Sequence, residues 1–161
     1  MDEQIILKIR KVLIVLLVIW MVVVFLLSNQ QGTKSSGLSK KIALIVCFGN
    51  DETATTVEPL VRKIAHIIEY AIGAILFYGI LSTYRKFDMY PKMAMTIAFI
   101  LACAGLDELH QSFIDARNGT YIDIGIDAVG GVLGIAACFL IERMIGFIDN
   151  KVQEELDNQK Q

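Results

Sequence analysis

The sequence is short of the features that mark several common protein classes. It has only three cysteines, and their spacing suits neither a metal site nor a disulfide framework. The net charge is −2 and no basic patch with interleaved aromatic residues occurs, so we expect no nucleic-acid partner. No serine or cysteine occupies a nucleophile-elbow motif. The first apolar run ends in Ser28-Asn29-Gln30-Gln31, which offers no small-residue cleavage site, so we expect a retained helix and not a cleaved signal peptide.

Hydrophobic residues, in contrast, make up 55% of the chain and are gathered into long runs. One helical span of a bilayer needs about 20 consecutive, mainly apolar residues. Runs of this kind predict four transmembrane helices, at about residues 5–27, 60–84, 92–110 and 121–141. The predicted fold class is therefore all-α, a membrane bundle of four transmembrane helices.

The polar connection between the first and second spans predicts mostly loop, because it is rich in glycine, serine and threonine. Within it, residues 40–48 predict a short helix that Ser39 can cap. This helix is too short to cross a membrane, so we expect an interfacial or re-entrant segment. Pro59 suits the first turn of the second span.

We expect three parts along the chain. Residues 1–11 are a cytoplasmic N-terminal segment, and residues 12–141 are the transmembrane domain. Residues 142–161 are charged and only weakly amphipathic, so we expect a frayed helix in water.

Positive charges set the expected orientation. With four spans, three regions share one side of the membrane, and these carry Lys8, Arg10, Lys11, Arg85, Lys86, Lys92, Arg143 and Lys151. The positive-inside rule makes that side cytoplasmic, although lysines in the connection at 28–59 weaken the asymmetry. We expect both termini in the cytoplasm. The start of the second span, the end of the third and the start of the fourth then meet at the extracellular face.

Titratable side chains are concentrated at these three span ends. Such groups are costly to place in a membrane, so they are functional candidates by default. The candidates for catalysis are His66, Glu69, Asp107 and His110. The candidates for substrate binding are Arg62, Lys63, Glu108, Gln111, Arg117, Asp123 and Asp127. A purely structural polar pair explains His66 and Glu69 equally well, and Asp123 can simply be an acid favoured at a helix N-terminus.

Helical spacing predicts which of these side chains share a face. Three stripes emerge: Arg62, His66, Glu69 and Gly73; then Asp107, His110 and Gln111, with Glu108 on the flank; then Asp123, Asp127, Gly130 and Gly134. The last two glycines form a G-x-x-x-G pair that permits close helix approach. Each polar stripe therefore continues into a packing face and points into the bundle.

Charge imposes two further expectations. Cations at the start of the second span and anions at the end of the third both oppose the helix dipole, so we predict that Arg62 or Lys63 contacts Asp107 or Glu108. Six acidic side chains in the clusters also face only three basic ones. The excess must be relieved by carboxyl protonation, charged histidine, a bound cation or water.

Several stretches, in this order, resemble the VanZ-like family: FLLSNQ at 25–30, RKIAHIIEY at 62–70, DELHQSF at 107–113, Arg117, and the D-x-x-x-D-x-x-G spacing of Asp123, Asp127 and Gly130. The resemblance covers nearly the whole chain except the tail. It implies a small multi-pass protein of a bacterial plasma membrane. The member that gives the family its name is associated with resistance to teicoplanin, a glycopeptide antibiotic.

Three functions fit this sequence. The first is binding of a membrane lipid or lipid-linked envelope precursor at the outer polar site, with a contribution to teicoplanin resistance as one outcome. The second is an acid/base or metal-assisted enzyme acting on a lipid-linked substrate. The metal ligands of such an enzyme would come from His66, Glu69, Asp107, Glu108 and His110. The H-x-x-E spacing of His66 and Glu69 is not a recognised zinc signature, so we assign no metal site. The third is proton-coupled transport, which four spans without an internal repeat disfavour. The sequence specifies neither a cofactor nor an oligomeric state.

Overall fold

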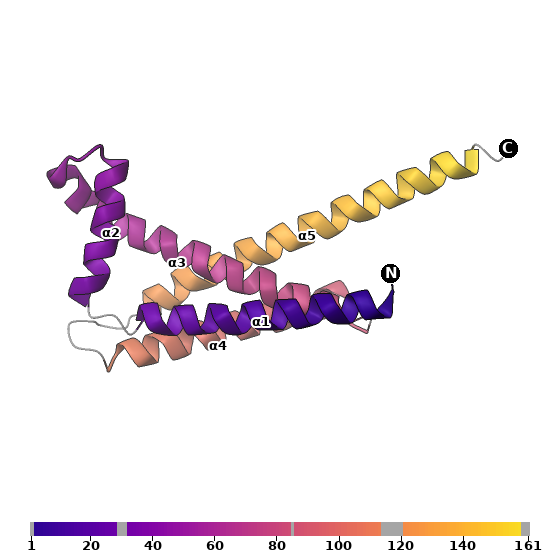
Figure 1. Cartoon of the computed structure of the whole chain (residues 1–161), viewed down its shortest axis with the longest axis horizontal. Coiled ribbons are helices and arrows are strands. Elements are labelled where there is room, and N and C mark those ends of the chain that lie inside the picture. Colours follow the sequence, from indigo (N-terminus) through magenta and orange to yellow (C-terminus); the bar gives the residue numbers. More distant parts are fainter. Residues whose placement is uncertain (1, 29–31, 85, 114–120, 159–161) are drawn as a thin grey trace.

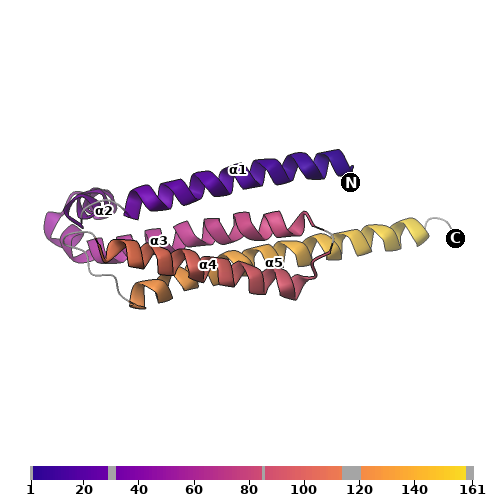
Figure 2. The same ribbon diagram turned by 90° about the horizontal axis from the view of Figure 1, so that it is seen from below.

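The computed structural model describes residues 2–28, 32–84, 86–113 and 121–158, and all the regular structure in these residues is helical. The helices are α1 (Glu3–Ser28), α2 (Gly32–Val46), α3 (Asp51–Ser82), α4 (Met89–Gln111) and α5 (Tyr121–Asn158). All except α2 are long and apolar enough to cross a membrane. The predicted fold class, four spans with a short helix between the first and second, is confirmed. Figures 1 and 2 place both termini at one end of the bundle and α2 at the other.

Three expected loop or frayed segments are helical in the structure. α2 begins at Gly32, within the stretch predicted to be loop, and α5 continues to Asn158 without a break at residue 142. α3 begins at Asp51 and contains Pro59, which the sequence placed at the helix start. The Asn50 side chain caps α3 by accepting a 3.0 Å hydrogen bond from the Thr53 amide. Pro59 removes the amide partner of the Thr55 carbonyl, and this turn is exposed, so the loss is tolerated.

Glycines of α5 set its distance from α3 and α4. A Cβ atom on Gly130 would meet the backbone carbonyl of Ile67, and one on Gly134 would meet the carbonyl of Ala71. Gly131 packs against the Ile100 side chain of α4 in the same way. Van der Waals packing drives helix association in lipid, so the absence of these Cβ atoms lets α5 seat closely against both neighbours. The predicted packing face is confirmed.

Trp20 fixes α1 to α3. Its indole Nε1–H donates a 2.9 Å hydrogen bond to the Glu69 carbonyl, and its ring fills the space above Gly73. Tyr70 meets the same ring edge to face, with 5.8 Å between centroids. Most other residues of α1 are exposed in the bundle, as expected for a helix with one face to protein and the rest to lipid.

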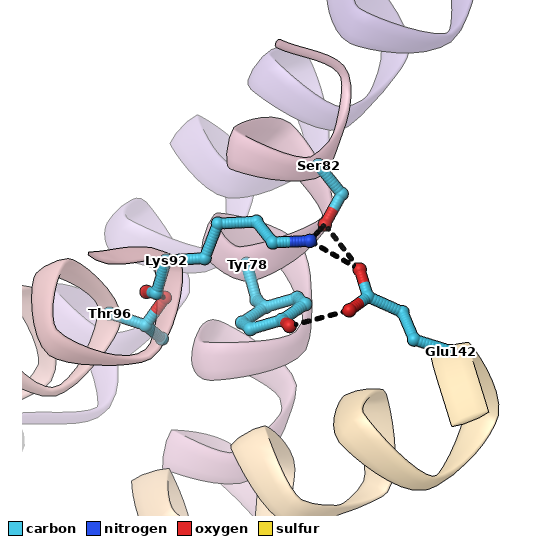
Figure 3. A network of polar contacts seen from close by, with 5 residues as sticks. All are labelled: Tyr78, Ser82, Lys92, Thr96 and Glu142. Atoms are coloured by element: carbon cyan, nitrogen blue, oxygen red, sulfur yellow. Dashed lines mark hydrogen bonds and ion pairs between the residues drawn. The ribbon is translucent and has the colours of Figure 1, made fainter. Parts of the chain in front are cut away.

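A polar network joins α3, α4 and α5 at the end of the bundle where the chain termini lie (Figure 3). Lys92 is 8% exposed and forms an ion pair with Glu142. The Tyr78 hydroxyl donates a 2.9 Å hydrogen bond to the other oxygen of Glu142, and the Ser82 hydroxyl lies 3.2 Å from the first. Arg10 of α1 docks nearby, donating to the Thr83 hydroxyl and carbonyl at 2.8 and 3.0 Å.

We expect Glu142→Gln to destabilise the bundle by about 1–2 kcal/mol, because Lys92 then keeps a buried charge without its counterion. The Glu142 side chain is 34% exposed, so solvent screening holds the loss below that of a fully buried pair. SDS-driven unfolding of the protein in mixed micelles measures the change. The double variant Lys92→Met/Glu142→Gln should recover part of the loss, whereas additive losses would show that the two side chains do not interact.

Candidate functional site

The last two turns of α4 bury a polar face. Asp107, Glu108 and Gln111 are 7%, 6% and 7% exposed, and they continue the buried positions Ile100 and Ala104. The Gln111 amide donates a 2.6 Å hydrogen bond to Asp107 Oδ2. The sequence pattern placed Glu108 on the flank of this face. The structure instead buries it beside Asp107. A helical period of 3.6 residues places positions 104, 107, 108 and 111 on one stripe, so both acids fit it.

Asp127 of α5 lies against this buried polar face of α4. It lies one turn before Gly130, where α5 and α3 come closest, and only 1% of it is exposed. Its Oδ1 atom lies 3.4 Å from Nδ1 of His66, the residue just before Ile67 of α3. The close glycine contact thus explains the position of the histidine–aspartate pair, which joins α3 and α5 in the bundle interior.

The two acids of α4 and Asp127 form what we call the carboxylate cluster: Asp107, Glu108 and Asp127. One oxygen from each lies within 4.8 Å of the others, and all three residues are buried. The expected meeting of the span ends is therefore seen directly in α3, α4 and α5. Three carboxylates this close cannot all remain charged in a dry interior without a compensating group.

The other predicted residues occupy different surroundings. Glu69 is half-buried, and its Oε1 atom is buried without a hydrogen-bond partner among the described residues. Asp123 is half-buried in the first turn of α5. Arg62 forms a 2.8 Å ion pair with Glu58 in its own helix, and Lys63 is exposed. The predicted contact of Arg62 or Lys63 with Asp107 or Glu108 stays a prediction. Arg117 lies outside the described residues.

His110 points to α1 and not into the carboxylate cluster. Its ring stacks on Phe25 with 4.9 Å between centroids. The two residues belong to a groove of about 290 Å³ between α1 and α4. We call it the α1–α4 groove, and its lining is Trp20, Met21, Val24, Phe25, Cys103, Leu106, Asp107 and His110. Asp107 and His110 are its polar residues, and Asp107 also belongs to the carboxylate cluster, so the groove reaches the edge of that cluster.

Two parts of this arrangement were missed at the sequence level. The first is the groove, since Trp20 and Phe25 lie in a run that reads only as a lipid-facing span. A single tryptophan in the middle of that run was the available signal, because buried indole groups need a hydrogen-bond partner. The second is the network of Tyr78, Lys92 and Glu142, because the sequence places Lys92 at a span end and Glu142 in the tail with no signal that they meet.

Comparison with known proteins now gives these residues a context. The family model VanZ/LLP1 matches residues 13–142, which include most of the first span, all of α3 and α4, the membrane-crossing part of α5, and every described candidate site residue. Searches of curated proteins and of solved structures returned no match. With the helical bundle and its four membrane-crossing helices, the match settles the general class. The chain belongs to the VanZ/LLP1 family and is a VanZ-like multi-pass membrane protein.

Proposed function

We propose that this protein binds a membrane lipid or lipid-linked cell-envelope precursor, with an acyl or prenyl chain in the α1–α4 groove and the head group at the polar site. The observation that carries the proposal is the continuity of the two. The groove is apolar along Trp20, Val24 and Cys103, and it ends at Asp107 and His110. Binding sites of this type combine an apolar lining with a few polar groups that fix orientation.

The polar end supports a head group with hydrogen-bond donors or positive charge. Asp107 and Asp127 are acceptors, and Nε2 of His110 is buried without a hydrogen-bond partner in the described part of the chain. Nδ1 of His66 faces Asp127 at 3.4 Å. An anionic phosphate would meet repulsion from these acids unless a cation or a basic side chain intervened. Arg62 and Arg117 are the basic candidates that the sequence supplies for that role.

Orientation is part of the proposal. The groove and the carboxylate cluster lie at the end away from Arg10 and Lys92. If the positive end faces the cytoplasm, as the positive-inside rule predicts, the site faces the outer leaflet of the plasma membrane. Lipid-linked cell-wall precursors become accessible there, and a contribution to teicoplanin resistance would follow from binding one of them.

Filling the groove tests the proposal. We expect Cys103→Trp to reduce the lipid retained by the purified protein at least tenfold, because the larger ring occupies space that the chain of the lipid needs. Native mass spectrometry of protein extracted in mild detergent measures the bound fraction. Leu101→Trp is the matched control, since this residue of α4 is 44% exposed and does not line the groove. Equal lipid retention in wild type and both variants would contradict the proposal.

One observation favours an enzyme as the second candidate. Asp127 Oδ1 lies 3.4 Å from Nδ1 of His66. If this contact shortens to a hydrogen bond when a substrate binds, the aspartate would orient the ring and leave the other nitrogen for proton transfer. Glu69 lies one turn later on α3 with an unsatisfied oxygen. Turnover of the co-purified lipid that is lost in His66→Gln while the lipid still binds would support catalysis. Binding without any turnover would support the binding function alone.

A further inference from the structure

The carboxylate cluster has the donor atoms of a hard-cation site. Its three oxygens come from Asp107 and Glu108 of α4 and Asp127 of α5, and they lie within 4.8 Å of one another. Oxygens on opposite sides of a Ca²⁺ ion are roughly 4.6–5.2 Å apart, twice the usual bond length. Mg²⁺ needs shorter bonds and a more regular octahedron. Three oxygens this close can reach a single cation of either size.

A second observation is independent of the spacing of the acids. Tyr70 of α3 is fully buried, and its hydroxyl has no hydrogen-bond partner among the described residues. Tyr70 lies one helical turn after His66, the residue that contacts Asp127, so the two share a face of α3. A buried phenol normally finds a partner, and a water on a bound cation would provide one. Asp127 shows the same deficit, since Oδ2 has no partner in the described structure and Oδ1 has only the long His66 contact.

We infer that Asp107, Glu108 and Asp127 bind one divalent cation of the oxygen-preferring class. Ca²⁺ is the first candidate, because its coordination tolerates irregular geometry better than that of Mg²⁺. Carboxylates and water are the ligands that Ca²⁺, Mg²⁺ and Mn²⁺ prefer, whereas zinc sites include histidine or cysteine among their ligands. The cation neutralises the excess negative charge that the sequence already revealed. It also ties α4 to α5 at the polar end of the groove, in the way that Lys92 and Glu142 tie them at the other end.

The cation also changes what the site can bind. Asp107 lines the polar end of the α1–α4 groove, so a cation bound to it would present positive charge where the bare acids repel anions. A phosphate group could then complete its coordination. The metal site itself rests on the geometry of the three acids and Tyr70 and does not depend on the proposed lipid.

Calorimetric titration of CaCl₂ into EDTA-treated protein in detergent tests the inference. We expect one Ca²⁺ per chain, at least tenfold weaker binding in Asp127→Asn, and unchanged binding in Asp149→Asn. Asp149 lies on the same helix but is exposed, so it controls for a general loss of negative charge. If Asp127→Asn does not fold, Glu108→Gln replaces it, with circular dichroism and gel filtration as the check on folding.

Two outcomes would overturn the inference. One is no saturable binding up to about 10 mM Ca²⁺, which is roughly tenfold above the dissociation constant of the weakest protein calcium sites. The other is equal affinity in wild type and Asp127→Asn. The first outcome would mean that protonation of the carboxyl groups and ordered water, without a metal ion, relieve the negative charge of the cluster. Bound Ca²⁺ in a protein that retains no lipid would leave the metal site standing and would contradict the proposed function alone.

Discussion

Gly130→Ala is expected to destabilise the bundle by about 1–3 kcal/mol, although the change adds a single methyl group. The new Cβ would press on the backbone carbonyl of Ile67, which cannot rotate away as a flexible side chain would. Overpacking of this kind forces the two backbones apart. Alanine is otherwise the better helix former by about 1 kcal/mol, so a loss of stability must come from the contact and not from helix propensity.

Gly146→Ala on the same helix gives the matched control. A Cβ at Gly146 meets nothing within 4 Å, so this substitution should be neutral or slightly stabilising. SDS-driven unfolding compares the two variants. If Gly130→Ala were as stable as Gly146→Ala, α5 would not be seated on α3 as described.

The same substitution should also weaken the functional site. Asp127 lies one turn before Gly130, and its contact with His66 depends on the close approach of α5 and α3. A shift of the helix by a few tenths of an ångström would lengthen a contact that is already 3.4 Å. We therefore expect lipid retention to fall together with stability in Gly130→Ala.

Trp20→Ala is expected to release α1 from the bundle, at a cost of about 3 kcal/mol. The value is at the lower end of the range for tryptophan truncation, because lipid solvates the exposed groups and no transfer from water contributes. Three contacts are lost together: the hydrogen bond to Glu69, the packing on Gly73, and the edge-to-face contact with Tyr70. The truncation also removes one wall of the α1–α4 groove.

Trp20→Phe separates these terms. It keeps an aromatic ring but removes the indole N–H, so we expect a loss of about 0.6 kcal/mol, the average value of a hydrogen bond between membrane helices. Val22→Ala provides a control at a residue of α1 that is 51% exposed. Proteolytic susceptibility of α1 and SDS-driven unfolding are the readouts. Similar stability of Trp20→Ala and Val22→Ala would mean that α1 is held elsewhere.

The sequence was sufficient for the architecture because long apolar runs carry a strong and simple signal. The connection at 28–59 shows the limit. Pro59 is favoured in the first turn of a helix, whereas an interior position costs about 3 kcal/mol in isolation. Here Asn50 caps α3 well before Pro59. Capping and the packing of α2 on α3 therefore outweigh the preference of proline for the first turn.

The candidate site was predictable in part for a similar reason. Polar residues at three span ends must share a membrane level once the spans are placed, so the meeting of His66 with Asp127 followed from topology. The exact face of α4 did not, because Glu108 joins Asp107 on the buried stripe and His110 turns to Phe25. Such choices depend on neighbouring helices, and a single sequence contains no record of which helix lies beside which.

The central claim is that one lipid occupies the α1–α4 groove with its head group at the carboxylate cluster. Photocrosslinking tests it most directly, with a benzophenone amino acid placed at Val24 in the groove or at Val129 on the exposed face of α5. We predict that the Val24 position captures one lipid class far above its share of the membrane, and that Asp107→Asn abolishes the enrichment. The Val129 position should report bulk lipid. Identical bulk-like adducts at both positions would contradict the account.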